Sequence, residues 1–85
     1  MLSTPDNRRR SLLTSIVFGA GPPQPVRDLV REMGTVHGIA VSADLVRGDL
    51  TWLAEQGLVR KVDDAALHTE RGRDVALGNA PWPGA

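Results

Sequence analysis

Three polar side chains between residues 42 and 51 have types and spacing suited to contact with nucleic acid. Arg47 carries a planar guanidinium that can donate two parallel hydrogen bonds to a guanine base. Thr51 follows one helical turn later, and its hydroxyl and methyl groups suit a phosphate or a thymine methyl. Ser42 stands where a helix is expected to begin, and a phosphate is favoured there by the helix dipole. These residue types could contact bases and phosphates if the helix lay in the major groove of DNA.

Neighbouring residues extend this predicted surface. Gly48 would let the helix backbone approach a partner closely. Arg60 and Lys61 are neighbours in the sequence and would suit contacts to a nucleic-acid backbone. The predicted DNA-contacting residues are Ser42, Ala43, Asp44, Arg47, Gly48, Thr51, Arg60 and Lys61.

Acidic residues oppose this interpretation. Asp44 and Asp49 lie on the same predicted helix, and Asp63 and Asp64 occupy the turn where a cation would suit DNA better. The 85-residue chain carries ten basic and ten acidic residues, whereas proteins that rely on phosphate attraction are usually basic. Asp44 is also explained by the helix dipole, and Asp49 by simple solvation.

Two basic groups have a second explanation as well. The run from Arg8 to Arg10 could reach phosphates, but such runs are more often solvated chain ends. Arg60 and Lys61 could instead be charges on an edge strand that discourage aggregation.

Large apolar side chains suggest an alternative partner. Trp52 falls between the predicted core stripe and the exposed face, one or two turns from Leu45, and Trp82 lies between two prolines. Tryptophans in such positions usually pack within their own domain. The alternative is a patch formed by Leu45, Trp52 and Trp82 that contacts a second copy or another protein.

No residue pattern typical of an enzyme or a metal site occurs. The chain has no cysteine, and His37 and His68 lie 31 positions apart without carboxylates at metal-binding spacing. We expect His37 to hydrogen-bond the last carbonyls of a helix. No nucleophile, base and orienting residue form a recognisable set, so we expect no catalytic residue, metal or cofactor.

Apolar periodicity predicts a mainly α-helical fold with one β-hairpin. In the third helix Val46, Leu50 and Leu53 recur at the spacing of one face, so they should point inward and leave Arg47 outside. Ser42 and Thr69 are the expected caps of the last two helices, and Gly38 and Gly57 the expected terminators. The predicted helices span 8–18, 25–37, 43–56 and 69–77, and the predicted strands span 58–62 and 65–68.

Two segments resemble a known family. The stretch VSADLVRGDLTWLAEQGLV from Val41 to Val59 resembles the recognition helix of winged-helix bacterial repressors of the arsenic-repressor and multiple-antibiotic-resistance-repressor type. HTERGRDVA, starting at His68, resembles the start of their closing helix, with histidine in place of the usual leucine. The layout of residues 8–78 is similar to small regulator-like proteins of Mu-like phages and prophages.

This resemblance implies a winged helix-turn-helix, in which a three-helix bundle is followed by a wing and a C-terminal helix. It further implies a dimeric transcriptional regulator that binds double-stranded DNA, or the same scaffold used to bind a phage protein without nucleic acid. We expect a disordered N-terminus over residues 1–7, one domain over 8–78 and an extended tail over 79–85. The sequence has no 18-residue apolar run and no export signal, which predicts a cytoplasmic protein without a membrane partner.

Overall fold

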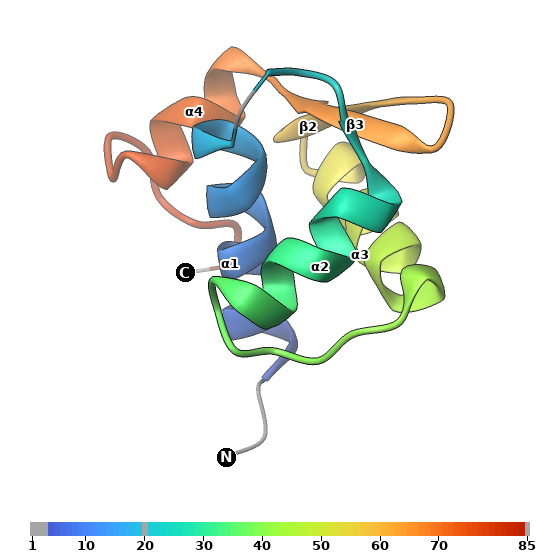
Figure 1. The fold of residues 1–85 in the computed structure, drawn as a ribbon. Helices are drawn as coiled ribbons and strands as arrows, with labels where there is room; N and C mark the ends of the chain where they lie inside the picture. Colours follow the sequence, from blue (N-terminus) through green and yellow to red (C-terminus); the bar gives the residue numbers. More distant parts are fainter. Residues whose placement is uncertain (1–3, 20, 85) are drawn as a thin grey trace.

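Helices and one small antiparallel sheet make up residues 4–19 and 21–84, the part of the chain that a computed structural model describes. The elements are α1 (Pro5–Phe18), β1 (Gln24–Pro25), α2 (Val26–Thr35), α3 (Ala43–Glu55), β2 (Val59–Val62), β3 (Ala65–His68) and α4 (Glu70–Ala76). The strands are ordered β1-β3-β2, so the hairpin β2–β3 is extended on one side by β1 (Figure 1). This mixed α/β layout is compatible with a winged helix.

Capping residues fix the ends of α3 and α4. Ser42 accepts a hydrogen bond from the backbone N–H of Leu45 at 3.1 Å, and Gly57 ends the helical segment with a φ of 76°. Thr69 accepts from the N–H of Gly72 at 3.0 Å. The predicted caps Ser42 and Thr69 are therefore confirmed, and both helices begin where the sequence places them.

Helix α1 begins earlier than predicted. Thr4 accepts a hydrogen bond from the N–H of Asn7 at 3.1 Å, and Pro5 takes the first helical position, where its missing N–H is harmless. Residues 5–7, predicted to be a disordered end, therefore form the first turn of α1. Residues 1–3 of that predicted end lie outside the described residues.

Strand β1, which has only two residues, was not predicted from the sequence. Gln24 and Pro25 pair with Ala66 and Ala65 of β3. The buried Gln24 side chain donates from Nε2 to the carbonyl oxygens of Ser15 and Ile16, at 3.0 and 3.2 Å. These bonds satisfy carbonyls at the end of α1 and tie the sheet to that helix.

His37 does not cap a helix as predicted. Helix α2 ends at Thr35, and Nε2 of His37 lies 2.7 Å from Oγ of the buried Ser15 in α1. The histidine therefore joins the segment after α2 to α1.

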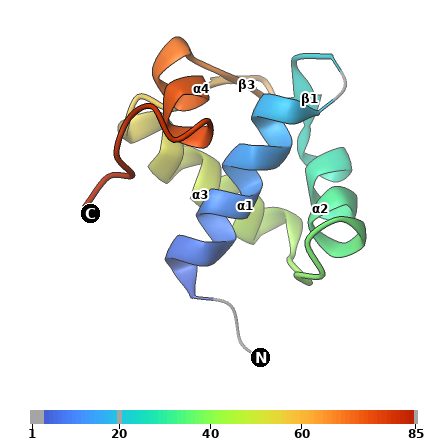
Figure 2. The same ribbon diagram turned by 90° about the vertical axis from the view of Figure 1, so that its left-hand side faces the viewer.

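The core lies where the helices meet around α1. Figure 2 shows α1 crossing the centre of the view, with α2 on one side and α3 and α4 on the other. Val46, Leu50 and Leu53 are at most 1% exposed, which confirms the predicted inward face of α3. Gly72 brings α4 against the backbone of Leu58, where a Cβ atom would collide with the carbonyl oxygen. This contact explains why glycine occupies the fifth position of the HTERG segment.

A buried carboxylate joins α1 to α3. Nε and Nη2 of Arg8 donate to the two oxygens of Asp49 at 2.5 and 2.9 Å, and Nε of Arg9 donates to it at 3.0 Å. The Asp49 side chain is only 3% exposed. Its hydrogen bonds raise the pKa of Arg8. The expectation of a solvated Asp49 is wrong, as is that of a solvated chain end for Arg8 and Arg9, because α1 passes beside the middle of α3. Contact of this run with phosphate stays a prediction.

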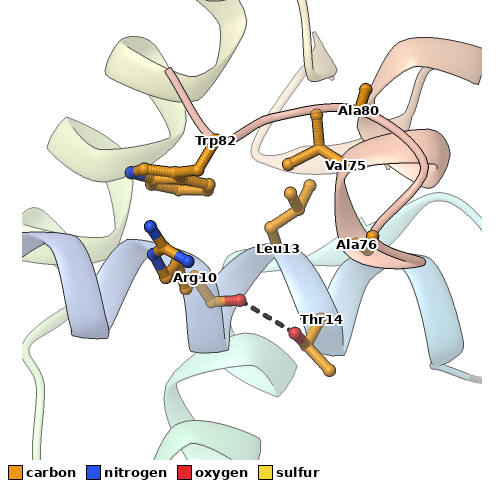
Figure 3. A pocket seen from close by; sticks show the side chains of 8 residues that line it. Arg10, Leu13, Thr14, Val75, Ala76, Ala80 and Trp82 are labelled. Carbon is orange, nitrogen blue, oxygen red and sulfur yellow. Dashed lines mark hydrogen bonds between the residues drawn. The ribbon is translucent and has the colours of Figure 1, made fainter. Parts of the chain in front are cut away.

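The C-terminal tail folds back onto this junction. The rings of Trp52 and Trp82 lie 5.6 Å apart, and the guanidinium carbons of Arg9 and Arg10 lie 4.5 Å over Trp52 and 4.9 Å over Trp82. Figure 3 shows Arg10 against Trp82, which closes one side of a pocket between α1 and α4. Trp82 is 6% exposed, so residues 79–84 are not simply an extended tail.

Replacing Asp49 by alanine should lower the free energy of unfolding by about 2–4 kcal/mol, because two partly buried arginines lose their counter-charge. Urea unfolding followed by circular dichroism measures the loss. The matched control is Asp44→Ala on the same helix, whose carboxylate is 95% exposed and should cost less than about 1 kcal/mol. Equal losses in the two variants would contradict a stabilising role for the buried carboxylate.

Replacing Trp82 by alanine should destabilise the protein by about 3 kcal/mol, because a buried ring and its stacking contacts are lost. Trp82→Phe should lose less than half as much stability as Trp82→Ala, because Nε1 of Trp82 is buried without a hydrogen-bond partner among the described residues and no bond is lost with it. Thermal and urea unfolding of both variants give the comparison. An unchanged Trp82→Ala variant would mean that the tail does not dock in solution.

Candidate nucleic-acid interface

The outer face of α3 carries the predicted contact residues. Ser42, Asp44, Arg47, Gly48 and Thr51 are exposed, and Ala43 is half-buried beside the core. Because the opposite face of α3 is buried, these side chains form one surface that a partner can reach.

Arg47 is bound by carboxylates from two elements. Its Nε and Nη2 donate to the two oxygens of Asp64, each at 2.9 Å, and its Nη1 donates to Asp44 at 2.9 Å. The contact with Asp64 is a two-point fork, the strongest geometry for an arginine and a carboxylate. The Arg47 side chain remains 47% exposed, so solvent still reaches this cluster.

Thr51 is also bonded to the hairpin. Its hydroxyl donates to the carbonyl of Arg47 at 3.1 Å and accepts from Nζ of Lys61 at 3.0 Å. Both side chains predicted to contact bases, Arg47 and Thr51, are therefore held by residues of the β2–β3 hairpin.

The two basic residues of β2 point in different directions. Adjacent residues of a strand face opposite sides of a sheet, and Lys61 is the one that reaches Thr51. Arg60 therefore faces the other side, and both are exposed on an edge strand. The structure separates this predicted pair, and only Lys61 adjoins the face of α3.

The tip of the hairpin is fixed to the body of the protein. Asp63 adopts a left-handed conformation with a φ of 53°, which tightens the turn. The carbonyl of Asp64 accepts from the N–H of Val26, the first residue of α2, at 2.9 Å. The side chain of Asp64 binds α3 while its backbone binds α2, so the tip is not a free arm.

Charges across this region balance. Arg47, Arg60 and Lys61 are matched by three carboxylates at Asp44, Asp63 and Asp64. Hydrogen bonds from Arg47 lower the pKa of Asp64, and the charges of Arg47 and Lys61 add to this effect. The hydrogen bonds that Arg47 donates, to Asp64 first and then to Asp44, raise the pKa of Arg47. Asp64 stays ionised at neutral pH, so it offsets the arginine charge that would attract phosphate.

The alternative patch of Leu45, Trp52 and Trp82 is not a continuous exposed surface. Trp82 is buried and Trp52 is half-buried, because they stack on each other. Leu45 alone remains exposed, at 38%. The three residues therefore do not form the predicted contact surface, and the packing interpretation of the tryptophans is correct.

Asp64 could not be predicted from the sequence as the main partner of Arg47. Its position in a turn indicated only a hairpin tip. Nothing in the local pattern shows which helical residue such a tip will meet, because the contact depends on how the hairpin packs against α3.

Comparison with known proteins finds a similarity to a phage protein. Over 48 aligned residues the chain is 46% identical to the uncharacterized protein gp26 of Escherichia phage Mu. The alignment covers 52% of this chain and 50% of the relative, so the chain spans about half the length of the relative it matches. This similarity supports a phage origin. No protein-family model and no solved structure matches the chain.

A membrane-spanning helix is also absent from the described residues. None of their helices is both long enough and apolar enough to cross a bilayer.

The lowered pKa of Asp64 predicts how its contact with Arg47 responds to acid. The stabilisation is complete above the ordinary aspartate pKa of 3.8 and is lost as the pH falls through the lower folded value. Titration of the Asp64 carboxyl carbon by NMR should give a midpoint below 3.8. Arg47→Ala should move this midpoint upward. A midpoint that does not respond to the arginine would show that the ion pair is absent in solution.

Proposed function

We propose that this chain is a winged-helix DNA-binding protein that acts as a phage-type transcriptional regulator. In this proposal α3 is the recognition helix and the β2–β3 hairpin is the wing. The observation that carries it is the position of Arg47, exposed on a capped helix whose other face is buried in the core. The similarity to a phage Mu protein and the helix-hairpin-helix order support the same proposal.

Binding requires Arg47 to exchange its present acceptors for those of DNA. Solvent screens the ion pairs of Arg47, because its side chain and those of Asp44 and Asp64 are exposed, whereas a two-point contact to guanine in the groove is shielded from water. The exchange is therefore energetically feasible. Ser42, Thr51 and Lys61 would then contact phosphates around the groove, and Arg60 would serve the outer side of the wing.

A second candidate is a protein-interaction module on the same scaffold. The observation that favours it is the equal number of cations and carboxylates around α3 and the hairpin, since such a surface has little attraction for a polyanion. Leu45 and the surrounding charges would then meet a phage protein with a complementary mixed surface. The dimer expected from the resemblance remains a prediction that sedimentation velocity checks, and the cytoplasmic location expected from the sequence also remains a prediction.

Replacing Arg47 by alanine should weaken binding to a duplex selected from a random pool by about 10-fold or more, because the guanine contact is lost. Fluorescence anisotropy at low salt measures the affinity. Arg27→Ala is the matched control, because this arginine of α2 is 88% exposed and its removal changes the net charge equally. Equal affinities of the two variants would exclude α3 as the reading helix.

The same selection separates the two candidate functions. If the wild-type chain retains no duplex at low salt but co-purifies specifically with a phage protein, the proposal of a protein-interaction module replaces that of a DNA-binding regulator.

A further inference from the structure

Asp64, at the tip of the hairpin, accepts hydrogen bonds from the N–H groups of Arg47 that would donate to a nucleic acid. A guanidinium offers two donors side by side, and the Nε and Nη2 pair is already bonded to both oxygens of Asp64. Guanine presents N7 and O6 as a similar pair of acceptors, and a phosphate presents two oxygens. Asp64 therefore holds Arg47 as a nucleic-acid acceptor would.

We propose that Asp64 is a specificity-determining residue that competes with nucleic acid for Arg47. This inference rests on the proposed DNA-binding function. The carboxylate withholds the arginine from any phosphate that does not turn both of its free oxygens toward the guanidinium fork, because one oxygen cannot replace both hydrogen bonds. An acceptor pair in the right orientation, as on a guanine edge, replaces both. Asp64 thereby suppresses binding to arbitrary duplex and leaves binding to the correct site.

The anchoring of Asp64 makes the competition specific to one side chain. Its backbone carbonyl is bonded to Val26, and Lys61 from the same hairpin holds Thr51. The tip is therefore tied to α2 and α3 by contacts that do not involve Arg47. Release of Arg47 needs a change in its own side-chain torsions and no opening of the hairpin.

The matched variants Asp64→Asn and Asp63→Asn test this assignment. Both remove one negative charge from the same turn, and asparagine tolerates the left-handed conformation of Asp63. The Asp63 side chain makes no hydrogen bond or ion pair with the described residues, so only Asp64→Asn removes a partner of Arg47, whose bond to Asp44 remains in both variants. We expect Asp64→Asn to bind a duplex of arbitrary sequence about 10-fold more tightly at low salt, and Asp63→Asn less than about 3-fold. The dependence of log affinity on log salt should steepen by about 0.9 for Asp64→Asn, the value for one added phosphate contact.

A double-mutant cycle shows whether the effect passes through Arg47. On an Arg47→Met background, Asp64→Asn should no longer increase the affinity for the arbitrary duplex beyond the effect of Asp63→Asn. An NMR signal from the Arg47 Nε–H, slowed in exchange by Asp64 in the wild-type chain, should exchange faster in Asp64→Asn. This second measurement needs no DNA, and the dispersion of the backbone amide signals in the same spectra shows whether the variants are folded.

The outcomes separate this inference from the proposed function. If the wild-type chain binds duplex but the two asparagine variants bind alike, or the gain persists on the Arg47→Met background, Asp64 does not compete for Arg47 and the inference is overturned. If no variant, including Asp64→Asn, binds any duplex at low salt, the DNA-binding proposal itself is overturned and the inference falls with it.

Discussion

The contact between Asp49 and the first turns of α1 is the interaction on which the arrangement of this small protein depends. A carboxylate that is almost fully buried is tolerated only when cations and hydrogen bonds compensate for lost hydration, and Arg8 and Arg9 provide both. The contact sets where α1 crosses α3. It also places Arg9 over Trp52, so that the stacked tryptophans and the tail pack onto the same junction. The opposite face of α3 is thereby left to solvent.

Local patterns predicted most of the fold because they depend on neighbours in the chain. Apolar residues at helical spacing identified the inward face of α3, and Ser42 and Thr69 marked where helices begin. The two strands of the hairpin were placed within one residue at their ends. The two-residue strand β1 was missed, because its pairing depends on β3, which follows much later in the chain.

Charged residues were harder to interpret, because a charge gives no periodic signal of its partner. Asp49 and Asp44 looked alike in the sequence, yet one is buried between two arginines and the other is exposed. Arg47 was placed correctly on the outer face, but its partner Asp64 comes from a different element. Such pairs are decided by tertiary packing, so the residues of the candidate site were predicted better than the contacts among them.

The docked tail has a consequence for how this chain should be divided into pieces. Gly78, after which the sequence suggested that the folded unit stops, lies in the wall of a pocket that Trp82 closes. A fragment cut at that glycine would remove the ring that packs on Trp52, open the pocket lined by Leu13 and expose apolar surface to water. A chain truncated at Gly78 would therefore tend to aggregate. A chain that ends after Pro83, the second proline of the tail, would keep the indole of Trp82 in place.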